Sequence, residues 1–171
     1  MKLRLVLILA LALMTPVGLG RVEAQPSTNC EATFDMFMSP GFWREGNSGT
    51  FTTNGEAGVV TCDGPVNGKE PTGPGTFGAH GRYGTHDPDT CSNVEGIYEN
   101  FMTVPTADGH EKVGNKGDWV AGAFKGSGAF GGRFTGETGD GTFEASPKEG
   151  DCVTKPLTRI TVVARWTMKE G

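Results

Sequence analysis

The chain has 171 residues, of which 28 are glycine, and its 15 basic and 20 acidic side chains give a formal net charge of −5. A negative chain with scattered charges argues against nucleic acid and anionic membrane surfaces as partners. Aromatic residues persist between the glycines, whereas disordered glycine-rich segments usually lack such apolar anchors. The composition therefore indicates a folded, glycine-rich domain.

Residues 1–24 have the pattern of a secretory signal peptide. Two basic residues come first, the apolar run Leu5–Met14 follows, and small residues lead up to a cleavage position near Ala24. The apolar run is too short to span a bilayer, which favours a cleaved signal over a membrane anchor. We expect a secreted, extracellular or periplasmic protein with one β-barrel domain over residues 25–171 and no integral membrane segment.

The chain contains four cysteines, all beyond the expected cleavage position. An even number of cysteines in an exported chain indicates two disulfides, and the spacing alone leaves three pairings open. Structural zinc sites need closely spaced cysteine pairs, and none occurs in this sequence. We therefore predict a disulfide-stabilised protein without a metal site. The cysteines are Cys30, Cys62, Cys91 and Cys152.

The first half of the domain predicts strands separated by turns. Cys30–Met38 alternates loosely between apolar and polar residues, as a half-buried strand does. Gly49–Thr53 and Ala57–Cys62 flank Asn54-Gly55, a dipeptide that favours a type I′ turn because both residues tolerate positive φ. This pattern predicts a β-hairpin. Asp63–Gly75 is rich in glycine and proline and predicts a loop.

The second half continues in the same way. Thr76–Gly84 and Gly96–Val104 predict strands, and Asp108-Gly109 predicts the turn after the second of them. A meander is expected through residues 117–145. Leu157–Met168 is rich in β-branched residues and predicts the last strand.

The segment 117–145 sets the fold class. Phe124, Phe130 and Phe134 share one parity, and glycines lie between them on the same face of an extended strand. A flat sheet gains nothing from so many glycines, whereas a tightly coiled sheet uses them at bulges and corners. With no helical spacing in the domain, we predict an all-β fold: an antiparallel, strongly coiled β-barrel of about eight strands.

The sequence Gly126–Gly136 (GSGAFGGRFTG) resembles the glycine-rich hairpin of allene oxide cyclase and dirigent-like β-barrels. The resemblance covers this short segment alone. It implies an eight-stranded barrel with a ligand in the lumen and, in those families, cofactor-independent cyclisation or radical coupling. The glycine-rich section between Cys62 and Cys91 also looks like one in uncharacterised secreted actinobacterial proteins, which implies a compartment and no activity.

Four side chains are candidates for catalysis: His80, Arg82, Tyr98 and Glu99. Neighbouring residues in a strand face opposite sides, so only one of Tyr98 and Glu99 can face the lumen. A buried carboxylate with a raised pKa could act as a general acid or base, and the alternative is a solvated side chain on the outer face. The sequence contains no nucleophile motif of the hydrolase or metalloprotease types.

We predict that the protein binds a small apolar or aromatic ligand in the barrel or acts as an interaction module. The alternative is a cofactor-independent cyclase or isomerase, so enzymatic activity stays open, with a binding role favoured. No cofactor and no nucleic-acid partner are expected. The predicted ligand-binding residues are Tyr83, Tyr98, Phe124, Phe130 and Phe134.

Overall fold

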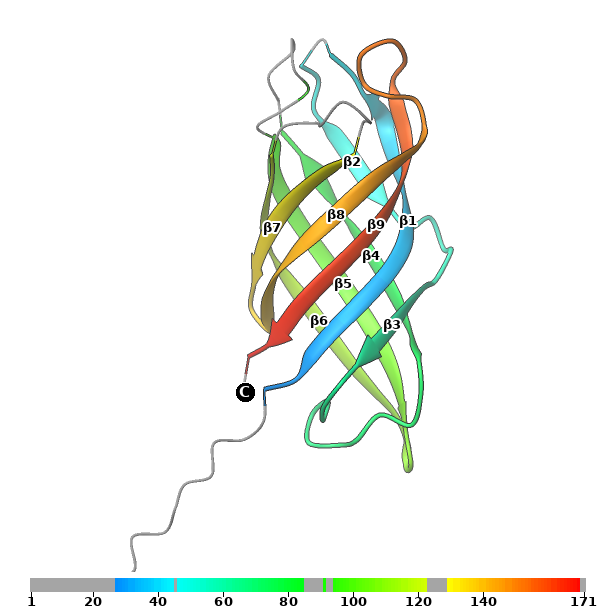
Figure 1. Ribbon diagram of the computed structural model, residues 1–171, viewed down its shortest axis with the longest axis vertical. Coiled ribbons are helices and arrows are strands. Elements are labelled where there is room, and N and C mark those ends of the chain that lie inside the picture. Colours follow the sequence, from blue (N-terminus) through cyan, green and yellow to red (C-terminus); the bar gives the residue numbers. More distant parts are fainter. Residues whose placement is uncertain (1–26, 45, 85–90, 92–93, 123–128, 170–171) are drawn as a thin grey trace, which may run out of the picture.

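The computed structural model describes residues 27–44, 46–84, 91, 94–122 and 129–169, and within them it contains nine β-strands (Figure 1). None of these described residues belongs to a helix long and apolar enough to cross a membrane. The strands are β1 (Asn29–Phe42), β2 (Gly49–Thr52), β3 (Gly58–Cys62), β4 (Gly75–Tyr83), β5 (Val94–Thr106), β6 (Gly109–Ala121), β7 (Phe130–Gly136), β8 (Gly139–Glu149) and β9 (Leu157–Met168).

The strands form one antiparallel sheet that closes into a ring. Neighbours in sequence pair from β3 through to β9, and β9 pairs back with β1 over most of the length of both strands. Hydrogen bonding thus runs through eight strand positions, which confirms the predicted antiparallel barrel (Figure 1). Closure matters because it gives each strand position two neighbours and removes the exposed edges of an open sheet.

The predicted hairpin at Asn54-Gly55 is wrong, although its turn forms. Both residues have positive φ (51° and 78°), and the amide of Glu56 donates to the carbonyl of Thr53 across the turn. The flanking strands β2 and β3 do not pair with each other. Both pair with β1 on one side and β4 on the other, so they are two halves of one interrupted strand position. Pairing with β1 on one side and β4 on the other gives β2 and β3 more backbone hydrogen bonds than pairing with each other in a short hairpin would.

Alternation along each strand separates the core from the outer surface. Along β5, for example, Val94, Tyr98, Met102 and Val104 are buried, while the residues between them are largely exposed. The same period of two holds for β7, where Phe130 and Phe134 are buried and face the interior. The hydrophobic core is therefore the barrel lumen, as expected when an eight-stranded barrel is filled by side chains.

Disulfides secure both ends of the barrel. Cys30–Cys62 joins β1 to β3, where the two residues are direct cross-strand partners, and Cys91–Cys152 joins the two connections that precede β5 and β9. The prediction of two disulfides is confirmed, and the structure selects one of three pairings. Val66, in the loop between β3 and β4, is fully buried at the same end as the first disulfide.

Candidate functional site

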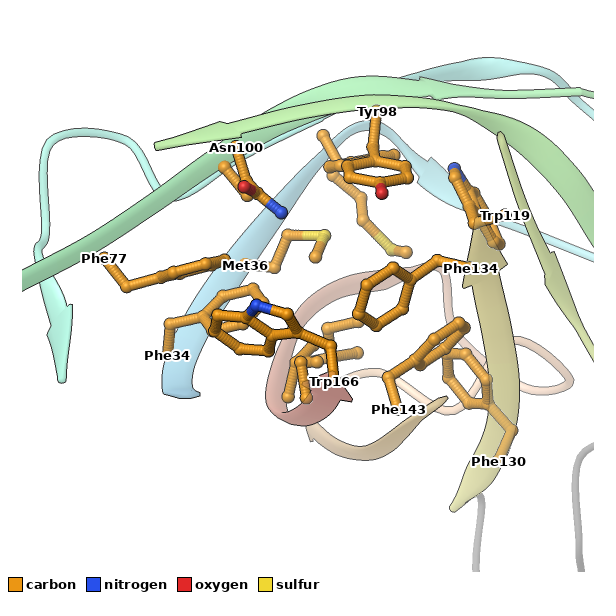
Figure 2. A pocket seen from close by; sticks show the side chains of 16 residues that line it. Phe34, Met36, Phe77, Tyr98, Asn100, Trp119, Phe130, Phe134, Phe143 and Trp166 are labelled. Carbon is orange, nitrogen blue, oxygen red and sulfur yellow. The ribbon is translucent and has the colours of Figure 1, made fainter. Parts of the chain in front are cut away.

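A cavity of about 80 Å³ lies in the barrel lumen (Figure 2). Its wall consists of aromatic rings, aliphatic side chains and methionines, and its polar groups are the side chains of Tyr98 and Asn100 and the indole N–H groups of Trp119 and Trp166. None of the described lining residues carries a charge. Sixteen described residues line it: Phe34, Met36, Met38, Phe51, Phe77, Ala79, Tyr98, Asn100, Trp119, Phe130, Phe134, Phe143, Ile160, Val162, Ala164 and Trp166.

Glycines on the inner face leave space for the aromatic rings of the cavity wall. The ring of Phe143 lies directly against its cross-strand partner Gly132, where an added Cβ would collide with it. Phe51 lies in the same way against its partner Gly81. The prediction that glycines face inward between rings is confirmed for the described part of the segment. Other inner glycines against which aromatic side chains pack include Gly49 (Tyr83), Gly58 (Phe34), Gly96 (Trp119), Gly136 (Tyr98), Gly139 (Trp166) and Gly141 (Trp166 and Phe134).

A polar group enters the lumen from β5 at Tyr98. Its hydroxyl oxygen accepts a hydrogen bond of 2.9 Å from the Asn115 side-chain amide on β6. Its ring packs edge-on against Phe134, with 5.5 Å between centroids. Burial raises the pKa of the Tyr98 phenol, and the negative charge of Asp140 raises it further. The phenol is therefore protonated at neutral pH, and it can donate a hydrogen bond.

The five predicted ligand-binding residues fall into three groups. Tyr98, Phe130 and Phe134 line the cavity. Tyr83 faces inward but lies outside the cavity wall, since it packs edge-on against Phe42 and its hydroxyl donates to the carbonyl of Pro40. Phe124 lies outside the described residues.

The four catalytic candidates are divided between the two faces of the sheet. Tyr98 faces the lumen, and its neighbour Glu99 faces outward as the strand geometry requires. Glu99 lies opposite His80 on β4, with 3.4 Å between Nε2 and Oε2, and the two side chains are 62% and 54% exposed. Arg82 is exposed on the same outer face. Of these four candidates, only Tyr98 faces the lumen.

Most of the cavity wall was not singled out from the sequence. Met36 and Met38 on β1, and Trp119 and Trp166 on β6 and β9, contribute to it. The parity of each predicted strand was the usable signal, because Phe34, Met36 and Met38 share one face of the first predicted strand. Asn100 carried no such signal, since an isolated polar residue at an inward position looks like a residue of the outer face.

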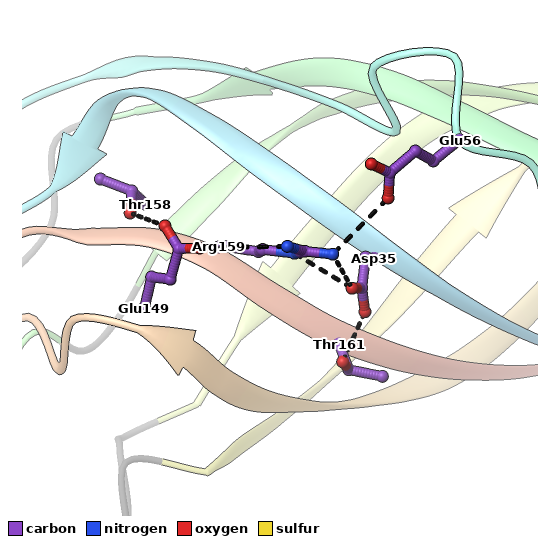
Figure 3. A network of polar contacts seen from close by, with 6 residues as sticks. All are labelled: Asp35, Glu56, Glu149, Thr158, Arg159 and Thr161. Atoms are coloured by element: carbon purple, nitrogen blue, oxygen red, sulfur yellow. Dashed lines mark hydrogen bonds and ion pairs between the residues drawn. The ribbon is translucent and has the colours of Figure 1, made fainter.

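A second polar cluster lies on the outer surface, where β1 meets β9 (Figure 3). Arg159 donates from Nε and Nη2 to one carboxylate oxygen of Asp35, at 3.1 and 2.7 Å, and Thr161 donates to the other oxygen. Glu56 and Glu149 approach the same guanidinium at 3.6 and 3.9 Å. The hydrogen bond from Thr161, followed by the one from Arg159, lowers the pKa of Asp35 against the opposing effect of burial. This cluster links the closing strands and forms no cavity.

Among the residues that the structure describes, no group of three His, Cys, Asp or Glu side chains is placed to hold a metal ion. No protein-family model matches the chain, and no curated protein or solved structure matches it either. The resemblance to allene oxide cyclase and dirigent-like barrels therefore stays a prediction.

Proposed function

We propose that this protein binds a small, largely apolar molecule inside its barrel. The observation that carries the proposal is the lumen cavity, whose wall is built almost entirely from aromatic and aliphatic side chains. Ligand sites are typically concave, mostly apolar and supplied with a few convergent polar groups. Here Tyr98 and Asn100 are among those groups.

The volume limits the occupant. At about 80 Å³ the cavity is roughly half the size of an engineered apolar cavity of ~150 Å³ that accepts benzene, and it is far below the ~300 Å³ of a drug-sized site. The occupant is therefore no larger than about one ring. Met36 and Met38 in the wall are unbranched and change rotamer readily, which gives the lumen room to adapt.

A binding role has more support than the alternative of a cyclase or isomerase. The carboxylate of Glu99 and the imidazole of His80 face outward, so neither reaches the lumen. The phenol of Tyr98 has a raised pKa and is a poor general base at neutral pH. An interaction role through a free strand edge has less support as well, because the ring gives each strand position two neighbours.

Two disulfides are consistent with an extracellular or other oxidising compartment. Secretion with cleavage near Ala24 extends this compartment assignment and belongs to the proposal. The intact mass of the exported protein tests it, because cleavage elsewhere or none at all would give a different mass.

Titration with benzene tests binding. Trp119 and Trp166 line the cavity, so a saturable change in tryptophan emission is expected as the ligand enters. At ten times its Kd, benzene should stabilise the fold by about 1.4 kcal/mol and raise Tm by about 3–6 °C. Absence of both responses up to the solubility limit of benzene would contradict the proposal.

A matched pair of variants locates the binding site. Ala79 lines the cavity, and Ala79→Leu adds three carbon atoms to its wall, so benzene binding should be lost while the far-ultraviolet spectrum is kept. Ala107→Leu makes the same change at an exposed position between β5 and β6 and should bind like the wild type. Equal binding by both variants would place the ligand elsewhere.

A further inference from the structure

We propose that the natural occupant of the lumen is a molecule without negative charge that has a small apolar body and one oxygen atom that accepts hydrogen bonds from Tyr98 and Asn100. This inference rests on the function proposed above and narrows the class of ligand. Three features of the β5–β6 wall support it: the free proton of one phenol, the unpaired amide of one asparagine, and the absence of charge from the cavity wall.

The first feature is the orientation of the Tyr98 hydroxyl. The side chain of Asn115 is held in one orientation, because its Oδ1 accepts from the amide of Thr138 at 2.9 Å. Its Nδ2 therefore faces the other way and donates to Tyr98 at 2.9 Å and to the carbonyl of Gly139 at 3.1 Å. Tyr98 must act as acceptor in this contact, so its own proton remains to be donated. Among the described residues, no acceptor receives it.

The second feature is Asn100, which lies opposite Asn115 in the β5–β6 register and opposite Ala79 on β4. It belongs to the inward-facing set of β5, and its amide extends toward the space between Met36 and Tyr98 (Figure 2). Within the described part of the chain its side chain makes no hydrogen bond. Asn100 is half-buried, and an amide partly withdrawn from bulk water gains from a polar partner, so a polar atom of a ligand or a water molecule is expected there.

The third feature argues against an anionic ligand. The sixteen lining residues include no Lys, Arg or His that could pair with an anion. A carboxylate in the lumen would lose its hydration without gaining a counter-charge from these residues, whereas a carbonyl or hydroxyl oxygen meets two neutral donors.

The test compares cyclopentane, cyclopentanone and cyclopentanecarboxylate as probes, with binding followed in ¹H–¹⁵N spectra that include the Asn100 side-chain amide. We expect the hydrocarbon and the ketone to bind, the ketone to shift the Asn100 amide signal, and the carboxylate to fail. Tyr98→Phe and Asn100→Leu should each weaken the ketone about fivefold relative to their effect on cyclopentane, the effect of one hydrogen bond. Tyr83→Phe removes a hydroxyl outside the cavity and should leave both affinities unchanged.

The outcomes separate this inference from the function on which it rests. If cyclopentane and benzene bind while the ketone loses nothing in Tyr98→Phe or Asn100→Leu, the polar contacts are wrong and the apolar site stands. A ketone that leaves the Asn100 signal in place means that water satisfies this amide, which also overturns the inference. Tight binding of the carboxylate overturns the argument against an anionic ligand. If none of the neutral probes binds the wild type, the proposed function fails with it.

Discussion

Two strand pairs of the barrel differ in the side-chain contacts that stabilise them. The β7–β8 pair depends on shape inside the lumen, where the ring of Phe143 occupies the space that a side chain at Gly132 would take. The β1–β9 pair depends in addition on charge outside the barrel, where Arg159 links Asp35 to two further carboxylates. Both pairs are antiparallel backbone ladders, so comparing them shows what the side-chain contacts add to each pair.

The outer ion-pair network lies beside irregularities in the strand ladders. Register shifts occur in the β1–β9 ladder between Phe37 and Phe42, and in the β8–β9 ladder between Pro147 and Glu149. Arg159 pairs with Phe37 and Glu149 beside these shifts, and its guanidinium lies 4.9 Å from the ring centroid of Phe37. Outer ion pairs also occur in the regular part of β1–β9, where Arg165 lies 2.6 Å from Glu31. The β7–β8 pair is distinguished instead by the packing of Phe143 against Gly132.

Gly132→Ala should have the largest effect, because the added Cβ collides with the carbonyl of Val120 and the ring of Phe143. Overpacking of this kind costs about 1–3 kcal/mol, and backbone on one side leaves little room to relax, so we expect about 2–3 kcal/mol in urea unfolding. The matched control is Gly131→Ala on the outer face, where the nearest atom lies at 3.4 Å. Equal stability of the two variants would contradict the steric account.

Asp35→Asn tests the outer network and should cost about 1 kcal/mol at pH 7, because the carboxylate is partly exposed and partly screened. The pKa of Asp35 is lowered in the folded state, so its contribution is complete above the unfolded pKa of about 4 and is lost as the pH falls through the lower folded value. The difference between wild type and variant should therefore shrink between pH 4 and pH 2.

Urea unfolding at pH 7, 4 and 2.5 measures this dependence. Asp108→Asn, in the exposed turn between β5 and β6, is a suitable control and should differ little from the wild type at each pH. A difference between wild type and Asp35→Asn that stays constant with pH would show that the charge of Asp35 does not stabilise the closing strands.

Glu99→Gln should have the smallest effect. Its pair with His80 is more than half exposed, and exposed pairs of this kind contribute less than about 1 kcal/mol, so we expect no more than about 0.5 kcal/mol. Benzene affinity should be unchanged, since Glu99 faces away from the cavity. Isothermal titration and urea unfolding check both points, and a loss of affinity would return Glu99 to the candidate site.

The strand position that β2 and β3 share, between β1 and β4, shows what a local sequence signal can and cannot predict. Asn54-Gly55 predicted a turn, and the turn forms with both residues at positive φ. The partner of each flanking strand could not be predicted, because a turn constrains four residues while pairing depends on every competing strand. The same limit applies to the disulfides: an even count of cysteines predicts that they pair, and only the fold selects Cys30–Cys62 and Cys91–Cys152.

The sequence by itself determined an all-β barrel, its disulfides and the inward direction of Phe130 and Phe134, because alternation and glycine placement are local properties of a strand. Only the tertiary structure decided that the side chain of Tyr98 points into the lumen and that of Glu99 points away from it. It also decided that Asn100 lines a cavity together with residues of β1 and β9. The apolar face of a strand such as β7 can be predicted from its alternation. Where both faces carry polar residues, as in β5, only ring closure establishes which face becomes the interior and which distant side chains meet there.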